Sequence, residues 1–124
     1  MSPPRILVVE DDESMRELLR LHLSSVGYTV EAVEDAIAAG YSVLKSQPGL
    51  IICDVAMPHM DGFELVAALR ADAGVSNDLP VIFLTSEREG EGRARDLGGE
   101  FLEKPVRLEE LLAAVSRHLP LPRR

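Results

Sequence analysis

The spacing of hydrophobic residues alternates between two periods along this chain. Five short apolar segments have the character of strands, and each precedes a segment whose apolar residues recur every three or four positions, as on a helix. The predicted strands span residues 5–10, 28–33, 50–54, 80–85 and 100–103. The predicted helices span residues 13–27, 35–49, 61–72, 88–99 and 107–119. Strand and helix therefore alternate five times.

The central strands indicate a sheet that is covered on both faces. The runs "LIIC" and "VIFL" are apolar at every position, which is typical of strands in a parallel sheet between two layers of helices. Residues 28–33 instead alternate like a half-buried strand, and because only Glu34 and Asp35 follow it, this strand should lie at an edge. We expect an α/β fold, a (βα)₅ three-layer sandwich. We expect one domain over residues 1–124, with its core from about 5 to 119 and a short tail at 120–124.

Apolar stripes on the helices indicate the faces that pack against the sheet. The stripes are Met15, Leu18, Leu19, His22, Leu23 and Val26 on the first helix, Ile37, Tyr41 and Leu44 on the second, Leu65, Val66 and Leu69 on the third, and Leu108, Leu111, Leu112, Val115 and Leu119 on the last. The fourth helix is different because residues 88–99 hold four glycines. Each glycine costs a helix about 1 kcal/mol relative to alanine, so we expect a short, mobile or partly unwound helix.

Composition excludes several classes of protein. The net charge of −8 and the pI of about 4.8 disfavour direct binding to nucleic acid, which depends on clustered Lys and Arg. No apolar run approaches the ~18 residues of a membrane span. The N-terminus has no apolar segment of the secretory kind, and the single cysteine, Cys53, excludes an internal disulfide. We expect a cytoplasmic protein with no membrane contact.

Polar residues gather where the predicted strands end. Because the carboxyl ends of parallel strands meet at one edge of a sheet, ligands bind at that edge. The residues that follow the strands are Glu10, Asp11 and Asp12, then Asp54, then Thr85 and Ser86, and finally Lys104. One acid after a strand is usually a helix cap, but acids, a hydroxyl and a lysine from four strands predict a site.

The chemistry of such a site follows from its charges. Glu10, Asp11 and Asp54 would repel one another, and Lys104 balances only one of the three. A divalent oxygen-seeking cation such as Mg²⁺ would balance the other two and leave room for phosphate oxygens. Asp54 could then attack phosphorus as a carboxylate nucleophile and form an acyl phosphate. Thr85 and Lys104 could hold its oxygens by hydrogen bond and charge.

These segments together resemble a known family. "ILVVEDDE", "DVAMPHMDG", "VIFLTSE" and "EKP" occur in the order and at about the spacing typical of the receiver domain of two-component response regulators, which includes the chemotaxis receiver. The resemblance covers residues 5–119 and implies a flavodoxin-like parallel sheet in the order 2-1-3-4-5. It also implies a phosphoacceptor that is not a turnover enzyme, and that takes phosphate from a histidine kinase or a histidine phosphotransfer protein.

The resemblance implies a role for each matching residue. Asp54 would be the phosphoacceptor, and Asp54 and Asp11 would bind Mg²⁺ directly, with Glu10 acting through water. The backbone carbonyl of Ala56 would complete the metal site beside the phosphoryl group. Lys104 would bind phosphate, and its peptide bond to Pro105 resembles one that is often cis in the family.

The resemblance also implies a switch at the fourth and fifth strands. Thr85 would close on the phosphoryl group, Ser86 would leave phosphorus accessible, and Phe101 would turn inward when Thr85 moves. The surface formed by the fourth helix, fifth strand and fifth helix would then bind an unidentified downstream protein or form a phosphorylation-dependent dimer. The 19 residues from Thr85 to Lys104 are fewer than is usual in the family, so we expect this surface to be remodelled.

Two other functions fit parts of the pattern. A pseudo-receiver would be an interaction module that takes no phosphate, and the glycine-rich fourth helix keeps this alternative open. A Mg²⁺ phosphatase of the haloacid dehalogenase type also uses an aspartate at a strand end. That family needs a second aspartate two residues later, where this chain has Ala56.

Overall fold

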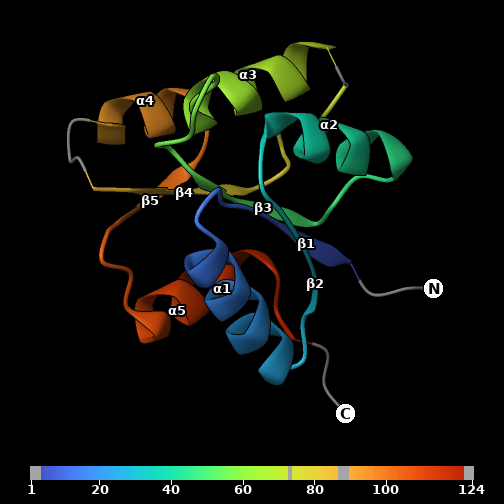
Figure 1. Ribbon diagram of the computed structural model, residues 1–124. Helices are drawn as coiled ribbons and strands as arrows, with labels where there is room; N and C mark the ends of the chain where they lie inside the picture. Colours follow the sequence, from blue (N-terminus) through green and yellow to red (C-terminus); the bar gives the residue numbers. More distant parts are fainter. Residues whose placement is uncertain (1–3, 73, 87–89, 122–124) are drawn as a thin grey trace.

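The computed structural model describes residues 4–72, 74–86 and 90–121 as five strands that alternate with five helices (Figure 1). The strands are β1 (Arg5–Val9), β2 (Thr29–Val33), β3 (Leu50–Asp54), β4 (Val81–Thr85) and β5 (Glu100–Glu103). The helices are α1 (Glu13–Ser25), α2 (Ala36–Lys45), α3 (Gly62–Asp72), α4 (Glu91–Asp96) and α5 (Leu108–His118). The predicted order of elements is confirmed, and most boundaries differ by only a few residues.

The five strands form one parallel sheet in the order β2-β1-β3-β4-β5, which confirms the predicted topology. Helices α1 and α5 lie on one side of the sheet, and α2, α3 and α4 lie on the other (Figure 1). The edge position of β2 is also confirmed. Every residue of β3 and β4 is buried because these strands are covered by helices on both faces.

Alternate residues of the strands build two hydrophobic cores. In β1, Ile6 and Val8 pack with the buried side chains of α1 and α5, whereas Leu7 and Val9 pack with those of α2, α3 and α4. This division follows from the period of two in a strand, which turns successive side chains to opposite faces. Cys53 lies in the second core and is fully buried, where burial raises the pKa of its thiol. It is a core thiol, as predicted.

Acidic caps fix where the helices begin, and thereby where the loops of the sheet's carboxyl edge turn. Asp12 accepts a hydrogen bond from the backbone N–H of Met15 at 2.8 Å, so its predicted role as the cap of α1 is confirmed. At the start of α3, the N–H of Glu64 donates to Asp61 at 2.8 Å and the N–H of Asp61 donates to Glu64 at 3.0 Å. This reciprocal pair is the predicted capping box.

The predicted buried stripe of α2 is wrong. Ile37, Tyr41 and Leu44 are exposed, and the buried residues of α2 are Ala39, Ser42 and Val43. Polar contacts favour this rotation of the helix, because the Ser42 hydroxyl donates to the Glu31 carboxylate at 2.6 Å and accepts from the Arg5 guanidinium at 2.9 Å. Two residues at the margin of the predicted α1 stripe, Leu18 and Val26, are also exposed.

Helix α4 is short, as the glycines predicted. It spans Glu91–Asp96, while residues 88 and 89 of the predicted helix lie outside the described part of the chain. Two contacts of Arg93 attach α4 to the N-terminal end of α3. Ala94 is fully buried, and the Arg93 guanidinium lies 5.1 Å above the Phe63 ring and 3.6 Å from the Asp61 carboxylate. The expected mobility of this helix stays a prediction.

Candidate functional site

The carboxyl edge of the sheet brings together side chains from four strands. Asp54 is the last residue of β3 and Thr85 the last of β4, while Glu10 follows β1 and Lys104 follows β5. Asp54 and Glu10 are 2% and 1% exposed, and Thr85 is also buried. Carboxylates are seldom buried without a partner, so their burial at one edge needs compensation.

Lys104 supplies part of that compensation. Its Nζ atom lies 2.8 Å from Asp54 Oδ1 and 3.5 Å from Glu10 Oε1, so a single ammonium group faces two buried carboxylates. Asp11 is exposed but adjoins both, and one carboxylate oxygen from each of Glu10, Asp11 and Asp54 lies within 4.8 Å of the others. Three carboxylates therefore share one ammonium group, so the cluster carries a net negative charge when all three are ionised.

Burial and the neighbouring carboxylate of Asp54 alter the protonation of Glu10. The pKa of Glu10 is raised to about 7, mainly by burial and then by the hydrogen bond to Asp54 and the Asp54 charge. The backbone N–H of Asp12 and the Lys104 charge act in the opposite direction. For Lys104, burial lowers the pKa, but the hydrogen bond to Asp54 and the nearby carboxylates outweigh it and raise the pKa overall. Lys104 is thus protonated at neutral pH.

The strand ends also position the remaining predicted residues. The backbone N–H of Lys104 donates to the Thr85 carbonyl at 2.7 Å, which joins the ends of β5 and β4, and the Lys104–Pro105 peptide bond is cis. Ser86 and Ala56 are exposed at the rim of the cluster. The N–H of Ala56 donates to Asp54 Oδ1 at 3.4 Å, a long contact.

Phe101 lies within β5, three residues before Lys104. It is half-buried in β5 beside Phe83 of β4, and packs against the core on the side of α2, α3 and α4. The structure thus brings together the acids and Lys104. Phe101 lies one residue before Leu102, which pairs with Leu84 of β4. The role of Phe101 in switching stays a prediction.

Gly62 has a role at this site that the sequence pattern did not indicate beyond a turn. A Cβ atom added at Gly62 would lie 2.4 Å from the Asp54 carbonyl oxygen and 3.0 Å from Cys53 Sγ. Its backbone N–H donates to the Val55 carbonyl at 3.0 Å. The first turn of α3 therefore passes directly against the backbone that carries Asp54, and only glycine leaves enough space.

We expect Gly62→Ala to destabilise the protein and displace Asp54. The inserted methyl group would meet backbone atoms that cannot rotate away, and overpacking of this kind costs about 1–3 kcal/mol. Denaturant unfolding would measure the loss, with Gly40→Ala as the control. A Cβ atom at Gly40 meets nothing within 4 Å, so that variant should be at least as stable as the unmodified protein. Equal stability of the two variants would contradict this prediction.

Comparison with known proteins identifies the family. The family model described as "Response regulator receiver domain" matches residues 6–116. The response regulator MprA of Mycobacterium sp. (strain KMS) is 40% identical over 114 residues, and MprA of Mycobacterium tuberculosis (strain ATCC 25618 / H37Rv) is 41% identical over 112. These matches cover 90% and 88% of this chain but 48% and 47% of the relatives. The chain therefore spans about half the length of the curated relatives it matches.

Solved structures agree with this result. The chemotaxis protein CheY4 of Vibrio cholerae has a TM-score of 0.86 and 33% identity, with 95% of this chain and 100% of that chain covered. The receiver domain of the sensor histidine kinase PA1611 from Pseudomonas aeruginosa PAO1, which has a magnesium ion coordinated in its active site cleft, has a TM-score of 0.81 and 28% identity. That match covers 95% of this chain and 98% of the other.

This chain belongs to the response regulator receiver domain family. It is a receiver domain of two-component response regulators, with a cluster of acidic residues near the expected phosphorylation site. Receiver domains are signalling modules rather than typical enzymes; they generally depend on Mg²⁺ and interact with histidine kinases and downstream effectors. None of the described helices is long and apolar enough to cross a membrane.

Proposed function

We propose that Asp54 accepts a phosphoryl group from a histidine kinase or a histidine phosphotransfer protein, and that this changes the binding of a downstream protein. The observation that carries the proposal is the environment of Asp54. This carboxylate ends a central strand, is 2% exposed, and lies 2.8 Å from the ammonium group of Lys104. A buried carboxylate beside a fixed cation is suited to receive and hold a phosphoryl group.

The acidic cluster fits a hard divalent cation. Its donors are carboxylate oxygens of Glu10, Asp11 and Asp54 within 4.8 Å of one another, the type of ligand that Mg²⁺ prefers. Asp11 and Asp54 would bind the ion directly, Glu10 through water, and the carbonyl of Ala56 would add a backbone ligand. When bound, Mg²⁺ would supply positive charge for the phosphoryl oxygens. It would also balance the charges that Lys104 leaves uncompensated.

Different residues of the chain have different roles in phosphoryl transfer. One Asp54 oxygen forms a bond to phosphorus while the phosphorus–nitrogen bond of the donor phosphohistidine breaks. The imidazole leaves with the bonding pair and takes up a proton. Lys104 and the Thr85 hydroxyl hold the transferred oxygens, and the small exposed residues Ser86 and Ala56 leave the phosphorus accessible. Slow hydrolysis of the acyl phosphate would reset the domain, so it acts as a switch rather than a turnover enzyme.

The consequence of phosphorylation should appear at α4, β5 and α5. The phosphoryl group adds a charge of about −1.5 to −2, and Thr85 would move toward it while Phe101 turns into the vacated space. The altered surface would bind a downstream protein or form a phosphorylation-dependent dimer. Since α4 has only six residues, the partner should differ from those that recognise a longer helix. We place this activity in the cytoplasm, without direct binding to nucleic acid.

Intact-mass analysis after incubation with acetyl phosphate and Mg²⁺ would test the proposal. We expect a gain of one phosphoryl group that requires Mg²⁺ and is slowly lost. No gain, under conditions that modify another receiver domain, would favour a pseudo-receiver that acts without phosphate. Steady release of phosphate from small phosphate esters would instead favour a phosphatase, although Ala56 occupies the position where the haloacid dehalogenase type has its second aspartate.

The affinity for Mg²⁺ should depend on pH through Glu10. Because the pKa of Glu10 is raised to about 7, a proton competes with the cation below that pH. We expect the apparent affinity to rise by up to about tenfold per pH unit toward pH 7 and to level off above it. Calorimetric titration at several pH values would measure this, and Glu10→Gln should make the profile flatter. The same affinity at pH 5 and pH 8 would contradict the prediction.

Folding stability without Mg²⁺ should follow the opposite trend. A carboxyl group whose pKa is higher in the folded state than its ordinary 4.5 binds more protons when folded. This contribution to stability is therefore largest at low pH and falls as the pH rises from about 4.5 to about 7. Mg²⁺ should restore stability above pH 7, where Glu10 is charged.

A further inference from the structure

Helix α2 presents an apolar surface that the proposed phosphoryl transfer does not use. Ile37, Tyr41 and Leu44 are 72%, 68% and 70% exposed, more than any other large apolar side chain in the described residues. Their spacing of four and three positions places them on one face of the helix. Isolated exposed apolar residues are ordinary, but a contiguous patch marks a surface for interaction.

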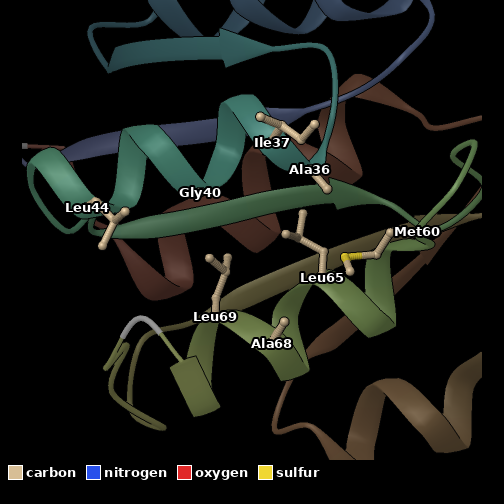
Figure 2. Close-up of a pocket in the computed structure, with 8 residues that line it drawn as sticks. All are labelled: Ala36, Ile37, Gly40, Leu44, Met60, Leu65, Ala68 and Leu69. Carbon is tan, nitrogen blue, oxygen red and sulfur yellow. The ribbon is translucent and has the colours of Figure 1, made fainter.

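A hollow lies beside this patch. It has a volume of about 340 Å³ and lies between α2 and α3, with Ala36, Ile37, Gly40 and Leu44 on one side. Met60 and the α3 residues Leu65, Ala68 and Leu69 form the other side, and Figure 2 shows Leu65 and Leu69 pointing from α3 toward α2. A Cβ atom at Gly40 would have nothing within 4 Å, so the middle of α2 is a gap between projecting side chains.

We propose that this surface binds a second copy of the same chain, with the two α2 helices packed antiparallel. A twofold interface requires a surface that is complementary to itself. A twofold axis between Gly40 and Tyr41 satisfies this condition, because it places the large Tyr41 of each copy over the gap at Gly40 of the other. It also places Ile37 opposite Leu44 of the second copy, and the projecting aliphatic side chains reach the hollow beside α3.

Charge also favours the antiparallel arrangement. The acidic residues Glu34 and Asp35 precede α2, while Lys45 ends it. Antiparallel packing places Lys45 of each copy near the acidic end of the other, and it opposes the two helix dipoles. Parallel packing would place acid against acid and lysine against lysine. The proposed orientation is therefore the one in which both the side-chain volumes and the charges match.

The dimer should be weak and reversible. A ten-residue helix is only about 15 Å long, so the interface falls below the roughly 800 Å² per partner of a standard stable complex. Each chain also carries a net charge of −8, which opposes association at low ionic strength. We expect a Kd in the micromolar range or weaker, as for other transient interfaces of small area.

Sedimentation equilibrium over a range of protein concentrations, without phosphoryl donor, tests this inference. We expect a monomer–dimer equilibrium for the unmodified chain and at least a tenfold weaker one for Tyr41→Glu. Leu21→Glu is the matched control, because Leu21 is an exposed apolar residue of α1, on the other side of the sheet. It should dimerise like the unmodified chain. Circular dichroism should show that both variants fold, since both substituted side chains are exposed.

Two further experiments test the orientation. Lys45→Glu should weaken the dimer, and the added substitution Glu34→Lys should restore it, because the charges are then exchanged. In a second experiment, Ile37→Cys protein mixed with Leu44→Cys protein should form a disulfide-linked heterodimer under mild oxidation. Each protein alone should cross-link poorly. The native Cys53 is fully buried and should not interfere.

The alternative outcomes are distinct. A monomer at all concentrations would overturn the proposal, including a monomer whose α2 surface binds an amphipathic peptide, since the occupant would then be another protein. A dimer that Tyr41→Glu leaves intact would also overturn it, because the interface would lie elsewhere. The association is measured without phosphorylation, so its absence would leave the proposed role of Asp54 unaffected. A failure of Asp54 to accept phosphate would leave the dimer unaffected.

Discussion

Asp54→Asn should not be phosphorylated by acetyl phosphate and Mg²⁺ under conditions in which the chain without this substitution gains a phosphoryl group. The amide has nearly the shape of the carboxylate but lacks a nucleophilic oxygen, so the loss should be complete. The substitution also removes one of the three negative charges that share the cation site. We therefore expect Mg²⁺ binding to weaken as well, by about tenfold or more. Intact-mass analysis and calorimetric titration would measure the two effects separately.

Asp12→Asn is the matched control for this experiment. Asp12 immediately follows the acidic pair, but its carboxylate caps α1 through the N–H of Met15. Asparagine caps helices as well as aspartate does, so the variant should fold normally and accept phosphate at nearly the same rate. Phosphorylation that persists in Asp54→Asn would show that another residue is the acceptor. An equal loss of phosphorylation in both variants would show that phosphorylation depends only on the total negative charge of this region.

Much of the site could be predicted because parallel strands bring their carboxyl ends to one edge. The two-sided apolar runs of β3 and β4 indicated central strands, and the residues that follow them had to meet the acids after β1. Local signals were equally direct for the caps, since Asp61 and Glu64 have the spacing of a capping box. The order of the strands came from the family resemblance, because hydrophobic periodicity does not encode which strands are neighbours.

The rest depends on contacts between distant residues. The apolar stripe of α2 predicted the wrong buried face, because hydrogen bonds from Ser42 to Glu31 and from Arg5 to Ser42 accompany a different rotation of the helix. The close approach of Gly62 to the Asp54 backbone depends on how α3 crosses β3, and no local sequence pattern predicts that crossing. The position of Lys104 between Glu10 and Asp54 was expected in outline, but the resulting pKa of about 7 for Glu10 required the burial of both acids.

Lys104→Ala should slow phosphorylation of Asp54 while it strengthens Mg²⁺ binding. The ammonium group lies 2.8 Å from Asp54 Oδ1, and a charge-assisted contact of this kind contributes about 1.5–3 kcal/mol. Its loss during phosphoryl transfer should lower the rate about 10- to 100-fold. The cation, in contrast, would meet three carboxylates with no competing positive charge. Phosphorylation rates and Mg²⁺ titrations above pH 7 would measure these opposite changes.

The opposite signs separate two roles of Lys104. If Lys104 only held the carboxylates in position, its removal would weaken phosphorylation and Mg²⁺ binding alike. The arrangement of the acids at the carboxyl edge of the sheet would then be lost. If it binds the transferred phosphoryl group, phosphorylation falls although the metal site improves. Arg107→Ala is the control, because Arg107 is an exposed cation on the same loop and makes no side-chain capping bond. Its removal should change both measurements only slightly, since exposed charges are screened by solvent.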